Sequence, residues 1–216
     1  MRVPVIGVTG SIASGKTTVA RLMAGDCGAL IDCDELAGRA LAAREVRTKL
    51  VAAFGARILG PGGHVSRRRL ARIVFARDRD IDRLNRIVRP RVKRIITDEV
   101  RRRRARAPYI VLDAVLLFQY TFRFKVDFAV ATRASGRTRL ARIMRRDGIS
   151  RAEALARIER QRRLEGGWAQ ADVVISTDRP LARVRRDVVR IRERFLANRS
   201  TNRRKVRCKR NSRTGR

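Results

Sequence analysis

Eight residues near the start of the chain have the types and the spacing needed to hold a phosphate. They read Gly10-Ser11-Ile12-Ala13-Ser14-Gly15-Lys16-Thr17 and match the pattern G-x-x-x-x-G-K-[ST]. In such a loop the backbone N–H groups curl around the phosphate, and the helix that follows points its positive end at the anion. The motif therefore predicts that this chain binds a nucleoside triphosphate.

Two side chains of the loop have separate expected roles. Lys16 is expected to reach the β- and γ-phosphates of ATP, and the Thr17 hydroxyl is expected to hold Mg2+. The motif requires a strand before it and a helix after it, and the patterns of residues 3–8 and 16–25 supply both. The predicted ATP-binding residues are Gly10, Ser11, Ala13, Ser14, Gly15, Lys16, Thr17 and Thr18.

Two carboxylates, Asp32 and Asp34, follow the short apolar run 29–31. Open α/β sheets place their chemistry at the carboxyl ends of the strands, which is where this pair is expected. A small-molecule kinase needs one carboxylate to orient the acceptor hydroxyl and take its proton, and another to help place Mg2+. A second interpretation makes Asp34 the N-cap of a helix over 35–41, and one side chain can serve in both roles.

With this loop and the spaced aspartates, the chain resembles the dephospho-coenzyme A kinases. Members of that family read roughly strand, T-G-G-I-G-S-G-K-S-T, helix, I-D-A-D, and the corresponding residues here are 9–18 and 31–34. The resemblance covers nearly the whole chain up to about Ala197. It continues through 54–59, 63–75, 88–90, 108–113, 116–118, 142–148, Gln161 and 171–175.

The resemblance implies an activity and a set of site residues. The activity is transfer of the γ-phosphoryl group of ATP to the ribose 3′-hydroxyl of dephospho-coenzyme A, the last step of coenzyme A synthesis. Arginines of a mobile lid would stabilise the transition state on closure, and Asp113, at the end of a predicted strand, would stand as a Walker B acid does. The implied residues are Asp34, Lys16, Arg142 and Arg146 for catalysis, Thr9, Asp34 and Arg89 for the acceptor, and Thr17, Asp32 and Asp113 for Mg2+.

Several residues depart from the family's pattern. Ser11 and Ala13 replace loop glycines, although the residues that the phosphate site requires are present. The other departures cluster around the acceptor side, where a carboxylate is lost and arginines are gained, which predicts either retuned acceptor binding or a weakened enzyme. They are Arg89 for His, Val115 for Pro, Gln119 for Glu, Arg133 for Asp and Arg139 for Gln.

The elements that position these residues alternate between strand and helix. Nearly continuous apolar runs predict buried parallel strands, whereas residues 35–105 have helical periodicity. The predicted fold is an α/β P-loop NTPase with three layers and a five-stranded, mainly parallel sheet. We expect a core over 1–34 and 106–197 with a lid at about 142–168, a helical coenzyme A-binding insertion over 35–105, and a basic, disordered tail over 198–216.

The charge of the chain is extreme. It has 54 Lys and Arg against 20 Asp and Glu, a net charge of +34, and the predicted tail holds only nine of the basic residues. Such a surface steers anionic substrates and favours non-specific nucleic-acid binding. The sequence contains neither an apolar stretch of membrane-spanning length nor a signal peptide, so we expect a cytoplasmic protein without a membrane partner. Nothing in the sequence indicates an oligomeric state.

Two other functions fit parts of the sequence. Another nucleoside or nucleotide kinase would share the loop, the aspartates and the lid, and only the acceptor would distinguish it. A nucleic-acid-binding protein with a residual P-loop would account for the charge. That interpretation lacks the aromatic side chains on which single strands stack, since only 5% of the residues are aromatic.

Overall fold

The computed structural model describes residues 2–119, 122, 124–162 and 168–200. These divide into two compact units. The first comprises the described residues of 1–31, 103–117 and 126–216, and the second comprises those of 32–102 and 118–125. The division falls three residues before each predicted boundary of the insertion, and 118–125 joins the second unit.

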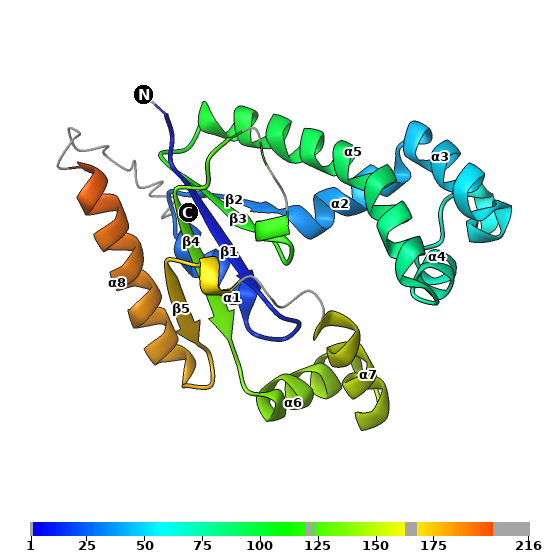
Figure 1. Ribbon diagram of the computed structural model, residues 1–216. Helices are drawn as coiled ribbons and strands as arrows, with labels where there is room; N and C mark the ends of the chain where they lie inside the picture. The colour runs from blue at the N-terminus through cyan, green and yellow to red at the C-terminus, as the bar shows by residue number, and fades with distance from the viewer. Residues whose placement is uncertain (1, 120–121, 123, 163–167, 201–216) are drawn as a thin grey trace, which may run out of the picture. The chain divides into compact units, whose positions relative to one another are not determined.

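A five-stranded sheet forms the centre of the first unit (Figure 1). Its order is β2-β3-β1-β4-β5, and the pairs β1/β3, β1/β4 and β4/β5 are parallel. β1 and β3 are buried along their whole length, as their continuous apolar runs predict. The predicted α/β fold with a five-stranded, mainly parallel sheet is therefore confirmed. The strands are β1 (Val5–Gly10), β2 (Ala29–Asp32), β3 (Ile110–Asp113), β4 (Phe128–Arg133) and β5 (Val173–Ser176).

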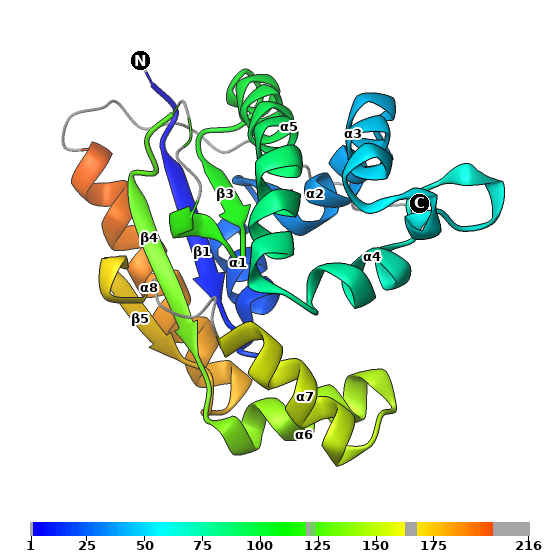
Figure 2. The ribbon, with the colours of Figure 1, turned by 45° about the vertical axis from the view of Figure 1, so that its right-hand side comes forward.

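Helices α1 (Lys16–Ala24) and α8 (Leu181–Ser200) pack against each other and against the sheet, as Figure 2 shows. Val19 and Met23 of α1 and Val184 and Val188 of α8 join one hydrophobic core with the strands. Leu181, at the start of α8, is 58% exposed because it lies in the first turn, ahead of the core. α8 also extends to Ser200, so the predicted tail begins later than residue 198, and its remainder, 201–216, lies outside the described residues.

The predicted lid, at about 142–168, begins inside α6 (Gly136–Asp147) and continues through α7 (Arg151–Arg162), and these two are the lid helices. The Ser135 side chain caps α6, and Gly148 ends it in a left-handed conformation with φ of 62°. A capping box begins α7. The Glu153 N–H donates to Ser150 Oγ, and the Ser150 N–H donates to the Glu153 carboxylate. The later part of the predicted lid includes residues 163–167, which lie outside the described residues.

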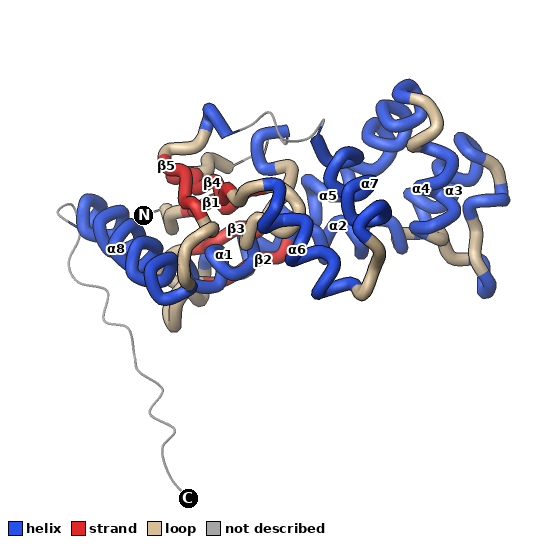
Figure 3. The backbone as a smooth tube through the Cα atoms, turned by 90° about the horizontal axis from the view of Figure 1, so that it is seen from below, coloured by secondary structure: helices blue, strands red, loops and turns tan. Residues whose placement is uncertain are grey.

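The second unit is built of helices, drawn in blue in Figure 3. Side chains of α3, α4 and the first half of α5 surround Leu50 and Ile58, which are fully buried. Pro90 lies inside α5, which nevertheless continues to Arg104 and spans 27 residues in all. The helices are α2 (Cys33–Ala42), α3 (Arg44–Phe54), α4 (Arg67–Val74) and α5 (Asp78–Arg104), and short 3-10 turns occupy Ala56–Ile58, Pro61–Gly63, Leu117–Gln119 and, in the first unit, Trp168–Gln170.

Within the described ranges, no helix is both long enough and apolar enough to cross a membrane.

Candidate nucleotide-binding site

The phosphate-loop motif lies where the strand order of the sheet reverses. The chain leaves β1 at Gly10 and returns into α1 at Lys16, and β1 has β3 on one side and β4 on the other. Val8 is in register with Asp113 of β3, and Gly10 is in register with Thr132 of β4. The crevice beside the carboxyl ends of the strands at such a switch point is the usual ligand site of open α/β sheets.

A tight turn shapes the outer part of the loop. The Ser14 N–H donates to Ser11 O at 3.1 Å, and the third residue of this turn, Ala13, has φ of +59°. Ala13 is the one non-glycine residue with positive φ in the described part of the chain. A left-handed conformation costs an alanine about 1–2 kcal/mol, so contacts around the turn must offset this strain. Gly15, the N-cap of α1, has φ of 84° at no such cost.

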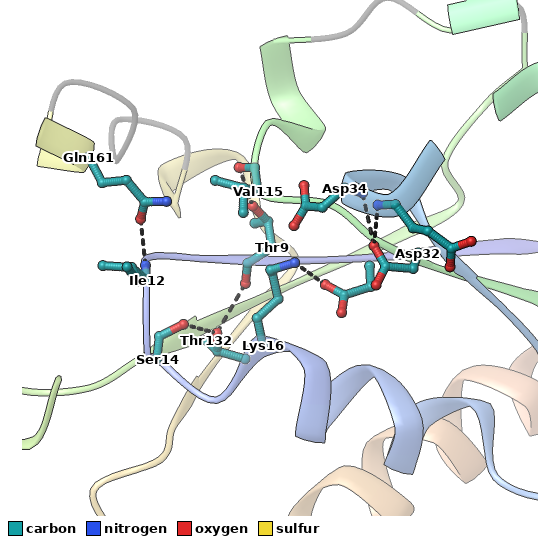
Figure 4. A network of polar contacts seen from close by, with 11 residues as sticks. Thr9, Ile12, Ser14, Lys16, Asp32, Asp34, Val115, Thr132 and Gln161 are labelled. Atoms are coloured by element: carbon teal, nitrogen blue, oxygen red, sulfur yellow. Dashed lines mark hydrogen bonds and ion pairs between the residues drawn. The ribbon is translucent and has the colours of Figure 1, made fainter. Parts of the chain in front are cut away.

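Buried hydroxyl groups join the loop to the neighbouring strand (Figure 4). Thr132 Oγ1 donates to Thr9 O at 3.2 Å, which leaves Ser14 Oγ as the donor in its 2.6 Å bond to Thr132 Oγ1. A Cβ on Gly10 would collide with both hydroxyl oxygens, so only glycine fits there. The Thr9 hydroxyl donates to Val115 O at 3.0 Å. Thr9, predicted to contact the acceptor, therefore also ties β1 to the chain beyond β3.

Two lid side chains bind the backbone of Ile12 in the turn. Arg139 Nε, from α6, donates to Ile12 O at 3.0 Å. The Ile12 N–H donates to Gln161 Oε1, from α7, at 2.6 Å (Figure 4). Arg139 is only 6% exposed, which is unusual for a guanidinium. The two helices thus hold the peptide groups on either side of Ile12, one through its carbonyl and the other through its N–H.

Arg142, predicted as a catalytic lid residue, makes a second connection. Its Nη1 donates to Ala13 O at 3.0 Å and to Thr177 Oγ1 at 2.9 Å, and its Nη2 donates to Thr177 O at 2.7 Å. Thr177 Oγ1 in turn donates to Ser14 O at 2.8 Å. The structure therefore brings Arg142 to the phosphate loop, where its guanidinium binds the Ala13 carbonyl and joins it to Thr177.

Lys16 forms a buried ion pair with Asp113, the last residue of β3. The two side chains are 10% and 2% exposed. The pairing unites two predicted site residues, one from the phosphate-binding set and one from the Mg2+ set. Because a buried charge is costly unless it is paired, each side chain stabilises the charged form of the other.

In the second unit, Asp32 rather than Asp34 caps α2. Asp32 Oδ1 accepts from the N–H groups of Asp34 and Glu35, at 2.9 Å each. This corrects the alternative interpretation that placed the cap at Asp34, because α2 begins at Cys33, two residues before the predicted start. Asp34 lies in the first turn with an exposed side chain.

Two predicted arginines have neighbours that the sequence did not indicate. Arg89 Nη2 donates to Gln119 Oε1 at 3.0 Å, so two of the departures on the acceptor side contact each other. Arg146 forms a two-point ion pair with the adjacent Asp147, with bonds of 2.7 and 3.0 Å. This hydrogen bonding lowers the pKa of Asp147 and raises that of Arg146.

Sequence reasoning missed the roles of Thr132 and Thr177. Each lies at the carboxyl end of its strand, Thr132 within β4 and Thr177 just after β5, where a polar residue at the end of an apolar run is the available signal. The role of Arg139 as a loop ligand was also missed, because nothing in a helical stripe of arginines shows which one points inward.

The fold and the loop define the class of P-loop NTPases. The solved structures of a dephospho-CoA kinase from Campylobacter jejuni (TM-score 0.57, 21% identity, 88% of this chain and 96% of that chain) and a gluconokinase from Sinorhizobium meliloti (TM-score 0.51, 18% identity, 94% and 99%) share this fold. A crystal structure of a Thermus thermophilus protein is more similar, with a TM-score of 0.73 and 32% identity over 92% of this chain and 98% of that one.

Sequence comparison then identifies the family. The dephospho-CoA kinase family model matches residues 4–182. The dephospho-CoA kinase of Moorella thermoacetica is 38% identical over 189 residues, 85% of this chain and 88% of its own length. That of Arabidopsis thaliana is 36% identical over 176 residues, 81% of this chain and 76% of its own. The chain belongs to the dephospho-CoA kinase family, as its motifs predicted.

Proposed function

We propose that this protein transfers the γ-phosphoryl group of ATP to the ribose 3′-hydroxyl of dephospho-coenzyme A. Family membership over residues 4–182 is the observation that carries the proposal. The intact loop from Gly10 to Thr17, at the switch point of the sheet, supports it independently.

The roles of the residues follow from their chemistry. The loop amides and Lys16 bind the β- and γ-phosphates, and Lys16 exchanges Asp113 for phosphate oxygens as its ionic partner. Asp34 orients the 3′-hydroxyl and accepts its proton as the oxygen bonds to the γ-phosphorus and the bond to the ADP oxygen breaks. Arg142 and Arg146 neutralise charge on the transferring group once the lid closes, and Arg146 must leave Asp147 to do so.

Mg2+ fits the oxygen donors available in the first unit. It prefers one or two carboxylates together with phosphate oxygens and water, so it does not need a cluster of protein ligands. The described residues contain no group of three His, Cys, Asp or Glu side chains that could hold a metal. The exposed Thr17 hydroxyl and the Asp113 carboxylate would hold the ion in this unit, and Asp32 is the further candidate. When bound, Mg2+ would neutralise phosphate charge.

The test is ATP consumption with Mg2+ and dephospho-coenzyme A, with adenosine, AMP and uridine as parallel acceptors. We expect turnover confined to dephospho-coenzyme A, and a loss of at least ~100-fold in the Asp34→Asn variant, whose amide cannot take the proton. Turnover with a different acceptor would show another nucleoside or nucleotide kinase. Failure with every acceptor would overturn the proposed activity and would mean that the departures from the family pattern have changed the substrate or silenced the enzyme.

A further inference from the structure

We infer that Arg139 is a positioning residue that holds the phosphate loop in its binding conformation against the strain at Ala13. The inference rests on the proposed binding of ATP by this loop, but it does not depend on the acceptor. It concerns a side chain that contacts the loop backbone.

The strain is local and identifiable. Ala13 is the third residue of the turn closed by the Ser14 N–H and Ser11 O, and its φ of +59° is one that such turns normally give to glycine or asparagine. An alanine there favours a right-handed alternative, in which the peptides around it would rotate. Because a phosphate binds to N–H groups presented by a left-handed turn of this kind, rotation of those peptides would dismantle the site.

The lid side chains oppose that rotation at the peptides that would move. Arg139 Nε holds the Ile12 carbonyl at 3.0 Å, and Gln161 holds the Ile12 N–H at 2.6 Å. Arg142 holds the Ala13 carbonyl at 3.0 Å. With these carbonyls turned toward α6, the N–H groups on the other side of the turn remain directed at the anion.

Among Arg139, Arg142 and Gln161, the side chain of Arg139 is the buried one. It is 6% exposed, and it arises from the second turn of α6, beside the buried Ile143. A guanidinium also supplies a charge-assisted donor, which binds a carbonyl more strongly than an amide does. Its removal should therefore release the Ile12 peptide and let Ala13 relax.

A double-mutant cycle tests the coupling between Arg139 and Ala13. The measured quantity is the Kd for ATP by calorimetry, without acceptor, for the unaltered protein and for Arg139→Met, Ala13→Gly and the double variant. We expect Arg139→Met to raise the Kd about tenfold, and only about twofold to threefold when residue 13 is glycine, since glycine adopts positive φ without strain. The Kd of Ala13→Gly alone is the reference for the double variant, because glycine at residue 13 removes the strain that Arg139 is inferred to oppose.

Two further variants show whether the Kd depends on the hydrogen bond from Arg139 to Ile12, on the charge of Arg139 or on folding. Arg145→Met removes an exposed arginine of the same helix and should leave the Kd within about twofold. Arg139→Lys keeps the charge but not the planar donor, and it should behave as Arg139→Met does. If either Arg139 variant fails to fold, Gln161→Leu provides the corresponding cycle with Ala13→Gly, because it removes the bond to the Ile12 N–H in the preceding peptide group.

The outcomes are distinct. An equal loss of affinity in the alanine and glycine backgrounds, or full affinity in Arg139→Lys, would overturn the inference, because Arg139 would then act through the fold or through charge alone. A protein that binds no ATP at all would overturn the proposed function, and the inference with it. If the protein binds ATP but phosphorylates no acceptor, the double-mutant cycle still tests the inference, because it measures only the Kd for ATP.

Discussion

Lys16 and Asp113 form the charge pair at the centre of the predicted phosphate site. Both side chains are almost fully buried, and they come from different elements, α1 and β3. Removing one member of a buried pair leaves the other charge without compensation, which costs far more than the net value of the pair. A bound triphosphate offers Lys16 a replacement partner, so the stability of the first unit and ATP binding should be coupled through this residue.

We expect Asp113→Asn to lower the free energy of unfolding by about 3 kcal/mol without nucleotide, because Lys16 loses a buried carboxylate. Urea unfolding at neutral pH measures this. Saturating ATP should narrow the difference, since phosphate oxygens then surround the ammonium group.

The control for this prediction is the variant Lys16→Met with Asp113→Leu, which removes both charges and should recover most of the lost stability. Unaltered stability in Asp113→Asn would show that the ion pair contributes little and that Asp113 is available for Mg2+ alone.

At the scale of elements, α6 determines how the lid meets the phosphate loop. Its N-terminus is fixed by Asp178, whose carboxylate accepts from the Ser135 N–H at 2.8 Å and from Ser135 Oγ at 3.2 Å. Hydrogen bonds from Thr138 and Ser135 lower the pKa of Asp178 below its usual value. Since Arg139 and Arg142 follow within two turns, an error in the start of α6 would misplace both arginines.

The lowered pKa of Asp178 predicts a specific pH dependence. Because the pKa of Asp178 is lower in the folded protein than its ordinary value of 3.8, its ionised carboxylate stabilises the fold at a pH above 3.8. This stabilisation is lost as the pH falls through the pKa of the folded protein. Asp178→Asn should therefore melt at a lower temperature than the unaltered protein at pH 7, and the gap should close as the pH falls from 4 toward 2.

The matched control is Asp98→Asn, which alters an exposed carboxylate on α5. We expect no comparable gap for that variant. A gap for Asp178→Asn that stays constant down to pH 2 would mean that its hydrogen bonds do not depend on ionisation.

The net charge of +34 is a property of the whole molecule, beyond the needs of one phosphate site. Residues 201–216 hold eight of the 54 basic residues, so most of the positive charge lies in residues 1–200, which include α8. Non-specific binding to nucleic acid remains a prediction, and its dependence on salt would distinguish it from a specific interaction.

A variant that ends at Ser200 should still bind single-stranded oligo-dT, with a shallower dependence of log Kd on log salt because fewer phosphates are neutralised. Fluorescence anisotropy across a salt series measures both slopes. Turnover should be the same for both proteins. Complete loss of binding on truncation would instead assign the interaction to the tail.

Much of this site could be predicted from local sequence. Glycines and a lysine at fixed spacing predict a turn and a phosphate ligand, because both depend only on residues that are adjacent in the sequence. The buried strands were predicted for the same reason, since a continuous apolar run needs no distant partner to be recognised. The sequence thereby determined the α/β fold, the P-loop at its carboxyl edge and the family.

Only the tertiary structure decided which distant side chains complete the loop. Asp113 lies 97 residues from Lys16, Arg139 lies 127 residues from Ile12 and Gln161 lies 149 residues from it. Such contacts depend on the strand order and on which turn of α6 faces the sheet, and neither property is encoded within one segment. The N-cap at Asp32 is a local contact, and the structure decided between Asp32 and Asp34 because α2 begins directly after the end of β2. Local pattern thus determined the loop, while long-range packing determined what holds it.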